Sequence, residues 1–287
     1  MFDSMGSILE ALSPEQQIAC STQNNILLTA CPGSGKTRTL THRLAYQVLR
    51  DPASKKIKIA ITYTNRAAEE ITNRLEGMNI DQSSIWAGTI HQFCMHFIIR
   101  PYAMYSKRLC KGYRIIDDYS KKAYGREIAE RLGMHLNYYD DPFQYENVRT
   151  EYKRVLKEKK EIDFDAILLI SEELLASCAF IGSNIASVIS SILVDEFQDT
   201  NELQYSILST IYKANKSIIL MFVGDVNQAI YSSLGGVAKG KKELETLYEI
   251  NFDSLSLKGC YRSTQRLVDL YSRFEISKTD AHSVAKY

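Results

Sequence analysis

The sequence predicts an α/β fold in which helices flank a parallel sheet, and three observations support this prediction. Four short apolar runs, rich in β-branched residues, recur along the 287-residue chain at 25–30, 58–63, 191–196 and 217–225. Each run is continuously apolar rather than alternating, as expected for strands that are buried on both faces of a parallel sheet. Helical patterns such as 36–50 and 66–77 separate the runs. Strand, turn and helix in repetition are typical of βαβ units.

The composition is that of an ordinary globular protein, with 45% hydrophobic and 24% charged residues. No apolar run approaches the ~20 residues that a membrane-spanning helix needs, and the first residues lack the pattern of a secretory signal. The six cysteines are scattered and form no CxxC pair, which favours reduced thiols in a reducing compartment. We therefore expect a cytoplasmic protein without a membrane partner.

The texture of the sequence changes between about residues 98 and 162. This stretch is rich in tyrosine and charge and has no strong strand run, so we expect a mainly helical insertion. The predicted organisation is a sheet domain formed by 1–97 and 163–287, interrupted by a subdomain at 98–162. The charged run at 153–161 is more typical of a solvated helix face than of a binding site.

A glycine-rich loop between the first expected strand and helix has the context of a phosphate-binding loop. Gly33 and Gly35 let backbone amides close around phosphate oxygens, and the following helix N-terminus favours negative charge. Lys36 would face the β- and γ-phosphates, and the Thr37 hydroxyl would ligate Mg²⁺. A plain glycine-rich turn is the alternative. The predicted ATP-binding residues are Ala30, Cys31, Pro32, Gly33, Ser34, Gly35, Lys36, Thr37 and Arg38.

Two adjacent carboxylates follow the apolar run at 191–196. Asp195 would hold Mg²⁺ through water, and Glu196 would orient and deprotonate an attacking water, because hydrolysis needs both a metal and a separate base. Gln228, which follows the next run, could hydrogen-bond the γ-phosphate or the lytic water. Acids at an ordinary strand end are the alternative, which the upstream glycine-rich loop disfavours.

With these segments in order, the chain resembles the first motor domain of UvrD/Rep/PcrA-like superfamily 1 helicases. That resemblance implies a RecA-like P-loop parallel sheet flanked by helices, with a mainly helical inserted subdomain. It assigns Gln16 and Tyr261 to the adenine, and it places Arg262 at the γ-phosphate beside the catalytic residues Lys36, Glu196 and Gln228. The segments that carry the resemblance are Leu12–Gln16, Thr62–Glu69, Gly88–Cys94, Asp163–Asp165, Asp195–Thr200, Gly224–Tyr231 and Tyr261–Thr264.

Two of these segments predict contacts with single-stranded DNA. Flat side chains stand there at loop positions beside hydroxyl and amide groups, so base stacking and neutral hydrogen bonds to phosphates could hold a strand. Such contacts suit a chain whose formal net charge is only +1. A core tyrosine and a satisfied loop histidine are the alternatives. The predicted DNA-binding residues are Tyr63, Thr64, Asn65, Thr89 and His91.

Three departures separate the chain from this family. Ser233–Gly236 stand where the family carries an aromatic residue and an arginine, and a stacked base is worth ~1–3 kcal/mol, so a weaker grip on the strand is expected. Cys260 stands where an asparagine usually precedes the YRST segment. Up to Tyr287 the sequence shows no second RecA-like pattern, and one explanation is that it is the first half of a longer protein whose second RecA-like domain would supply a further arginine. A first RecA-like domain without the second is expected to hydrolyse ATP poorly.

These observations leave two functions open. The first is an ATP-dependent DNA helicase or translocase, with the 3′→5′ polarity that the resemblance implies, acting on single-stranded or tailed DNA. The alternative is a nucleotide- and DNA-sensing ATPase subunit that regulates a partner nuclease without efficient unwinding, as in Gabija-type anti-phage systems. A P-loop small-molecule kinase is disfavoured, because nothing in the sequence resembles a phosphoacceptor pocket or a lid.

Overall fold

The computed structural model describes residues 2–137, 139–228, 239–275 and 280–285. The chain divides into two compact units, which are described separately below. The first unit comprises Met1–Ile90 and Gly182–Tyr287, and the second comprises His91–Ile181. Among the helices of the described ranges, none combines the length and the apolar character needed to cross a membrane.

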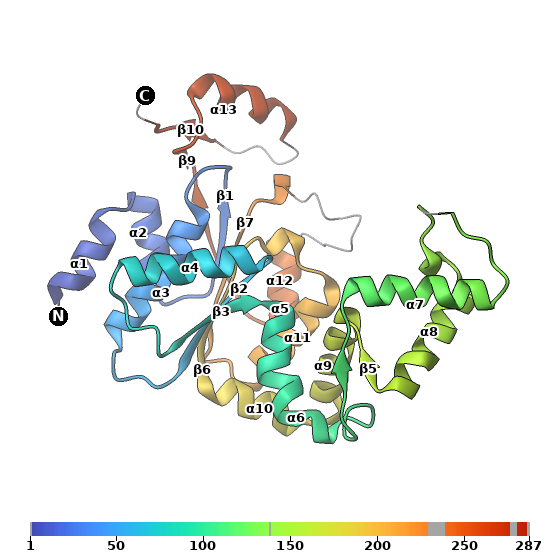
Figure 1. Cartoon of the computed structure of the whole chain (residues 1–287). Coiled ribbons are helices and arrows are strands. Elements are labelled where there is room, and N and C mark those ends of the chain that lie inside the picture. The colour runs from blue at the N-terminus through green and yellow to red at the C-terminus, as the bar shows by residue number, and fades with distance from the viewer. Residues whose placement is uncertain (1, 138, 229–238, 276–279, 286–287) are drawn as a thin grey trace. The chain divides into compact units, whose positions relative to one another are not determined.

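The first unit contains a six-stranded sheet in the order β3-β2-β6-β7-β1-β8, and every neighbouring pair of strands is parallel. The prediction of a parallel α/β fold is confirmed (Figure 1). The four apolar runs form β1, β2, β6 and β7, whereas β3 and β8 were not expected. The strands are β1 (Ile26–Ala30), β2 (Ile57–Thr62), β3 (Ile85–Thr89), β6 (Ile189–Val194), β7 (Ile219–Gly224) and β8 (Asp253–Leu257).

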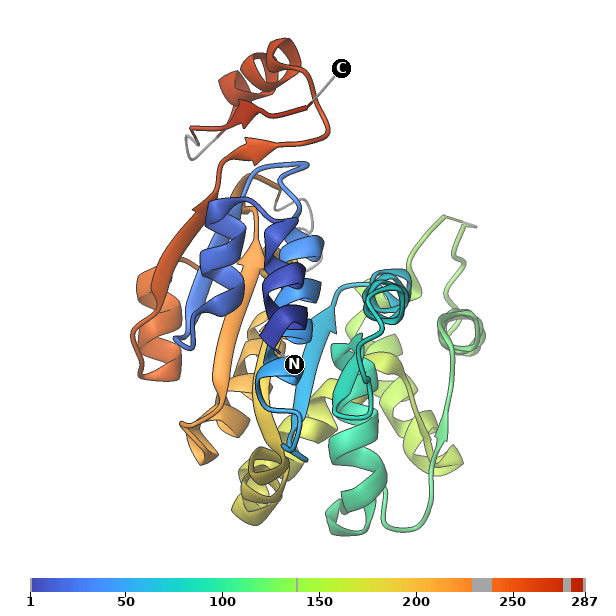
Figure 2. The ribbon, with the colours of Figure 1, turned by 90° about the vertical axis from the view of Figure 1, so that its left-hand side faces the viewer.

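One face of the sheet is covered by α3 (Lys36–Arg50) and α4 (Asn65–Gly77). Their apolar side chains join those of the strands in one buried cluster, as expected for a sheet that is packed on both faces. Figure 2 shows α1 and α2 beside α3 in this unit, and both contact α3. The cluster includes Leu28, Leu40, Leu44, Ala60, Ile71, Leu75, Leu193, Met221 and Val223.

The opposite face is covered by α11 (Glu202–Ala214) and α12 (Lys241–Tyr248). Phe222 of β7 lies at the centre of a ring cluster, with centroid distances of 5.4 Å to Tyr248, 5.7 Å to Phe252 and 6.2 Å to Tyr205. The rings meet edge-on or tilted, the arrangement that aromatic pairs prefer. Consecutive residues of β7 thus serve opposite faces of the sheet.

Leu193 of β6 is fully buried in the aliphatic cluster. Replacing it with alanine is expected to lower the free energy of unfolding by about 2–5 kcal/mol, because transfer energy is lost and a cavity is left. Urea denaturation measures the change. Leu267, which is 51% exposed on α13, supplies the matched control, since its replacement should alter stability by only about 0.5 kcal/mol. Equal effects of the two substitutions would contradict the assignment of β6 to the core.

N-terminal caps fix where three helices of this unit begin. Ser13 caps α2 in a capping box with Gln16, Thr64 accepts a hydrogen bond from the Ala67 amide at the start of α4, and Asn201 caps α11. The other described elements of the unit include α1 (Phe2–Glu10), α2 (Pro14–Ser21), η4 (Phe197–Asp199), η5 (Val226–Gln228), β9 (Gly259–Cys260), α13 (Gln265–Tyr271), η7 (Ser272–Phe274) and β10 (His282–Ser283). The strand β10 pairs with β9 in a separate parallel ladder.

The second unit is mostly helical. A buried cluster that includes Ile128, Val148 and Leu156 joins α7 to α8, and the two-residue strands β4 and β5 pair beside them. Asp163 caps α9 and also accepts a hydrogen bond from the Tyr152 hydroxyl at 3.0 Å, which ties α8 to α9. The elements are η1 (Cys94–Ile99), α6 (Arg100–Tyr102), η2 (Ala103–Tyr105), β4 (Arg114–Ile115), α7 (Asp118–Arg131), η3 (Pro142–Gln144), α8 (Glu146–Lys159), β5 (Glu161–Ile162) and α9 (Phe164–Ser177).

The boundaries of this unit differ from the expected insertion at 98–162. The unit begins at His91 and ends at Ile181, because α9 packs against η1 and both belong to it. Side chains of both elements are fully buried, among them Cys94 of η1 and Ser171 of α9. Two short helices link the units at their boundaries, α5 (Ile90–Phe93) and α10 (Ala179–Val188).

Candidate active site

Three loops meet at one edge of the sheet because the strands before them are neighbours. The strand β7 lies between β6 and β1, and the carboxyl ends of parallel strands share one edge, where α/β proteins bind their ligands. The glycine-rich loop follows β1, the two carboxylates follow β6, and the 225–228 segment follows β7. Sequence segments almost 200 residues apart therefore face a common space.

The glycine-rich loop has a conformation that requires its glycines. Gly33 and Gly35 have φ angles of +76° and +85°, in the region that side chains disfavour. A Cβ at Gly33 would lie 2.6 Å from the Arg262 Cβ, and one at Gly35 would lie 2.8 Å from the Gln16 Nε2. The Ser34 hydroxyl is buried and has no hydrogen-bond partner among the described residues. The loop is thus closely packed, and its Ser34 hydroxyl is available to a further hydrogen-bond partner.

Lys36 contacts both of the other loops. Its Nζ lies 3.2 Å from the Glu196 Oε2 and donates to the Gln228 Oε1 at 3.5 Å. The lysine side chain is only 10% exposed, so solvent screens its charge weakly. The structure therefore brings together three residues for which the sequence predicted catalytic roles.

Thr37 and Asp195 form the second contact between these loops, with 3.4 Å between Thr37 Oγ1 and Asp195 Oδ2. Burial and the neighbouring Glu196 carboxylate raise the pKa of Asp195 to about 7, although Lys36 and the Thr37 hydroxyl act in the opposite direction. Two hard oxygen donors at a site that is short of positive charge suit a divalent cation such as Mg²⁺. These residues fit the predicted metal ligands.

A second carboxylate of this strand end has a perturbed pKa. Burial and the charge of Glu196 raise the pKa of Asp199 to about 6, and Lys36 lowers it. Its Oδ1 atom is buried without a hydrogen-bond partner in the described part of the chain. Carboxyl groups with perturbed pKa values are typical of functional sites, but Asp199 does not line the pocket described below.

Glu196 adopts the left-handed conformation, with φ of +51°. A non-glycine residue in that region is uncommon and is held there by its surroundings. The turn places the Glu196 side chain, which is 33% exposed, against Lys36 while the preceding Asp195 is buried. Adjacent acids consequently occupy different environments, which suits different roles for them.

A pocket of about 370 Å³ opens beside the cradle. Gln16 lies at its wall, where its amide donates to the Ser34 carbonyl at 3.0 Å and accepts from the Ser13 amide. Tyr261 also lines the pocket and is 47% exposed. The lining residues are Gln16, Pro32, Gly33, Gly35, Lys36, Thr37, Arg38, Glu70, Arg74, Glu196, Gln228, Tyr261 and Arg262.

Three predicted ATP-binding residues, Ala30, Cys31 and Ser34, do not line this pocket. Ala30 and Cys31 are buried at the end of β1, and the Cys31 thiol packs with Cys260 and Val268. Burial raises the pKa of the Cys31 thiol to about 11, so it stays protonated. Ala30 and Cys31 anchor the loop to β8, since the Cys31 amide donates to the Leu257 carbonyl.

Sequence reasoning missed three residues of this site. Glu70 and Arg74 line the pocket from α4 as an ion pair one helical turn apart. Their spacing puts both on one helix face, but it does not show where that face points. Gln198 donates to the Glu196 Oε2 at 2.7 Å. Its position inside the recognised Asp195–Thr200 segment was the signal that could have found it.

The predicted DNA-binding residues fall into two groups. Tyr63, Thr64 and Asn65 follow β2, and Thr89 ends the neighbouring strand β3, so these four share one edge of the sheet. Tyr63 is 43% exposed, so the alternative that it is a core residue is wrong. His91 belongs to the second unit, where its ring meets Phe164 edge-on at 6.0 Å and burial lowers its pKa.

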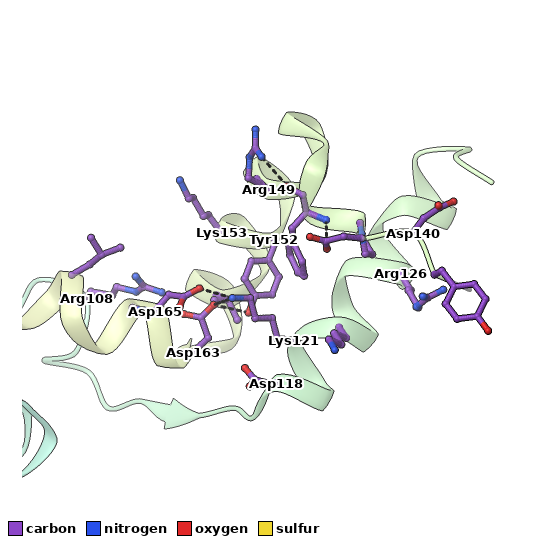
Figure 3. A pocket seen from close by; sticks show the side chains of 18 residues that line it. Arg108, Asp118, Lys121, Arg126, Asp140, Arg149, Tyr152, Lys153, Asp163 and Asp165 are labelled. Atoms are coloured by element: carbon purple, nitrogen blue, oxygen red, sulfur yellow. Dashed lines mark hydrogen bonds and ion pairs between the residues drawn. The ribbon is translucent and has the colours of Figure 1, made fainter. Parts of the chain in front are cut away.

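A larger hollow of about 860 Å³ lies within the second unit, between α7, α8 and the start of α9. Figure 3 shows charged side chains around it, with Lys121 beside Asp163 and Asp165. Lys121 pairs with Asp165 at 2.5 Å, so ion pairs occupy part of its wall. Its lining residues include no glycine-rich loop and none of the predicted site residues. The predicted catalytic residues line the smaller pocket instead.

Some sequence features lie outside the described residues. These are Ser233–Gly236, which replace the expected aromatic residue and arginine, and residues 229–231 of the Gly224–Tyr231 segment.

Comparison with known proteins identifies DNA helicases as relatives of this chain. The chain is 28% identical to the ATP-dependent DNA helicase PcrA of Leuconostoc citreum over 87% of the chain and 37% of that protein. It is 26% identical to DNA helicase II of Escherichia coli (strain K12) over 91% of the chain and 40% of that protein. The chain thus spans about two fifths of the length of these relatives. The Pif1 helicase structure from Candida albicans aligns over 91% of the chain and 44% of its own, with 13% identity and a TM-score of 0.47.

Residues 15–234 match the family described as AAA domain. This match spans every loop of the site except Tyr261 and Arg262, and the relatives over the same region are superfamily 1 helicases of the PcrA/UvrD type. The resemblance predicted from the motifs is confirmed. The chain belongs to the AAA domain family and is related to the N-terminal part of PcrA/UvrD-type helicases.

Proposed function

We propose that this chain is the first motor domain of an ATP-dependent DNA helicase or translocase that acts on single-stranded or tailed DNA. The observation that carries the proposal is the meeting of Lys36 with Glu196 and Gln228, beside the contact of Thr37 with Asp195. A phosphate-facing cation, a metal-binding pair and a candidate base on one pocket wall are the parts that phosphoryl transfer to water needs.

Triphosphate binding is supported by the loop itself. Gly33 and Gly35 have positive φ angles, and α3 begins at Lys36. Backbone amides and a helix N-terminus form an anion site. The unpartnered, buried Ser34 hydroxyl is a further group that a phosphate oxygen would satisfy.

Thr37 and Asp195 would hold the Mg²⁺ that accompanies ATP, Thr37 directly and Asp195 through water. The metal would neutralise phosphate charge when bound. In this proposal Glu196 orients the attacking water and accepts its proton, while Lys36 balances negative charge on the β- and γ-phosphates. Gln228 and Arg262 line the same pocket, and both would contact the γ-phosphate or the lytic water.

Adenine recognition is assigned to the far wall of the pocket. The exposed ring of Tyr261 offers a stacking surface, and Gln16 lies near Gly35 with its amide hydrogen-bonded to the loop. The Gln16 amide keeps one N–H hydrogen free for a base edge after donating to Ser34. Both ends of the nucleotide would therefore touch the glycine-rich loop or residues packed on it.

Single-stranded DNA would cross the edge of the sheet at β2 and β3. The exposed Tyr63 ring supplies a stacking surface, and Thr64 and Asn65 stand at the N-terminus of α4, where phosphates are favoured. Thr89 adds a hydroxyl at the neighbouring strand end. His91, which belongs to the second unit, stays a separate prediction.

The test of this function is the rate of ATP hydrolysis with and without single-stranded DNA. We expect DNA to stimulate turnover, because the two proposed sites share one sheet edge. Turnover that DNA leaves unchanged would count against a DNA motor, and phosphate transfer to a small molecule instead of water would indicate a kinase.

Replacement of Tyr63 by alanine is expected to weaken single-stranded DNA binding by roughly 5–150-fold, which corresponds to the ~1–3 kcal/mol of one stacked base. Nucleotide affinity should hardly change, since Tyr63 does not line the ATP pocket. Fluorescence anisotropy with a labelled oligonucleotide measures the effect. Tyr119, which is 82% exposed on α7 of the second unit, provides a matched tyrosine-to-alanine control. An unchanged DNA affinity of the Tyr63 variant would refute the assignment.

A second function is favoured by one sequence feature. Ser233–Gly236 lack the aromatic residue and arginine of the helicase pattern, which suits an ATPase subunit that senses DNA and nucleotide and regulates a partner nuclease. Displacement of a strand from a 3′-tailed duplex separates the two functions. Unwinding of that duplex, but not of a 5′-tailed one, supports the helicase with 3′→5′ polarity, whereas DNA-stimulated ATPase without unwinding supports the regulatory subunit.

A further inference from the structure

Gln198 is a buried glutamine whose amide joins two loops of the site. It lies in η4, directly after the two carboxylates, and is only 2% exposed. Its Nε2 donates to the Glu196 Oε2 at 2.7 Å, and its Oε1 accepts from the Asp225 amide at 3.0 Å. One side chain thus links the loop after β6 to the loop after β7.

The surroundings of Gln198 leave its side chain little freedom. A Cβ at Gly224 would lie 2.2 Å from the Gln198 Oε1 and 2.6 Å from the Phe197 Cδ1, so only glycine permits this close approach. The Tyr205 hydroxyl of α11 donates to the Phe197 carbonyl at 2.8 Å and holds η4 in place. Gln198 therefore has a fixed position from which its amide can direct another group.

The contacts continue into a closed ring around the phosphate-facing wall. The Asp225 Oδ2 accepts from the Gln228 Nε2 at 2.9 Å, and the Gln228 Oε1 accepts from Lys36 at 3.5 Å. Lys36 in turn lies 3.2 Å from Glu196, which returns the ring to the group that Gln198 holds. Every residue of the ring except Gln198 and Asp225 lines the ATP pocket. Gln198 closes the ring through its hydrogen bonds to Glu196 and Asp225.

We propose that Gln198 is a positioning residue that aims the Glu196 carboxylate at the attacking water and ties it to the 225–228 segment. This inference rests on the proposed ATP hydrolysis, in which Glu196 is the base. The Glu196 side chain is one third exposed and could rotate among its rotamers without a second hydrogen bond. Misplacing a catalytic group by about 1 Å can lower the rate by about 10²-fold.

Replacement of Gln198 by methionine, which keeps the length of the side chain and removes both hydrogen bonds, tests the proposal. We expect kcat for ATP hydrolysis to fall roughly 10–100-fold, while KM and the affinity for a fluorescent ATP analogue change less than about threefold. Backbone amide exchange supplies a readout that needs no turnover: the Asp225 amide should exchange faster, because its acceptor is lost. Should Q198M fail to fold, Q198N, whose shorter side chain cannot reach both partners, is expected to show the same pattern.

Two comparisons distinguish positioning from a general structural role. Gln47→Met removes another buried glutamine, one that accepts from Ser191 on β6 and does not line the pocket, and it should leave kcat unchanged. In the double variant with Glu196→Gln, Q198M should lower kcat no further, because residues that act through one another are not additive. Equal losses in Q47M and Q198M, additive losses in the double variant, or a kcat of Q198M within about twofold of the unaltered protein would each overturn the proposal.

Failure of the proposed function gives a different pattern. If the unaltered chain, with DNA present, hydrolyses ATP no faster than Glu196→Gln, the assignment of hydrolysis to this site fails first. If the unaltered chain is active and Glu196→Gln is slow, but Gln198 variants are unaffected, only the role of Gln198 is refuted.

Discussion

Replacement of Lys36 by alanine is expected to abolish ATP turnover. The side chain is largely buried between Glu196 and Gln228, so its charge acts at short range on any phosphate in the cradle. A cation at the transferred phosphate is worth roughly 10³–10⁵ in rate, and we expect a loss of at least that lower size. Phosphate release in the presence of single-stranded DNA and Mg²⁺ measures it.

The same substitution removes the positive partner of Glu196, so its effect must be separated from a general change in charge. Lys216→Ala is the matched control, because Lys216 belongs to the same unit and pairs with Glu249 at the surface. That variant should keep normal turnover. Normal turnover by Lys36→Ala itself would show that ATP is bound elsewhere.

Replacement of Glu196 by glutamine is expected to separate binding from hydrolysis. The amide has the size of the carboxylate and can still contact Lys36 and Gln198, but it cannot accept the proton of the attacking water. We expect ATP binding to persist while turnover falls on the order of 10²–10⁴-fold. Binding is measured with a fluorescent ATP analogue, and hydrolysis is measured under single-turnover conditions.

Glu249→Gln supplies the control for Glu196→Gln. Glu249 is also a glutamate in the left-handed region, with φ of +57°, and it pairs with lysines, but it lies outside the pocket. The Glu249→Gln variant should hydrolyse ATP at the normal rate. If a well-folded Glu196→Gln protein fails to bind nucleotide, Glu196 is part of the binding surface rather than the base.

Much of the fold could be predicted from the sequence because buried parallel strands have a distinctive pattern. The runs that form β1, β2, β6 and β7 are continuously apolar, since helices cover both of their faces. The strands β3 and β8 were missed because they lie at the two edges of the sheet and contain Trp86, Gly88 and several polar or exposed residues. Edge strands need less apolar sequence, so periodicity finds them poorly.

The glycine-rich loop and the acids could be predicted because short-range geometry determines them. A strand, a glycine turn and a helix fix the loop, and Asp195 and Glu196 end a recognisable strand. Glu70 and Arg74 could not be assigned in the same way, because their roles depend on which distant segment lies opposite. Likewise, the end of the second unit depends on the packing of α9 against η1, a long-range contact that composition does not reveal.

The strand order has a consequence for how the chain acquires its structure during synthesis. The strand β2 can pair early with β3, but the partners β7 and β8 of β1 and the second partner β6 of β2 are synthesised much later. Both early strands therefore remain incompletely paired until then. The second unit is continuous in sequence and can fold while they wait. Loop closure over such separations slows folding, and the site is among the last features to assemble.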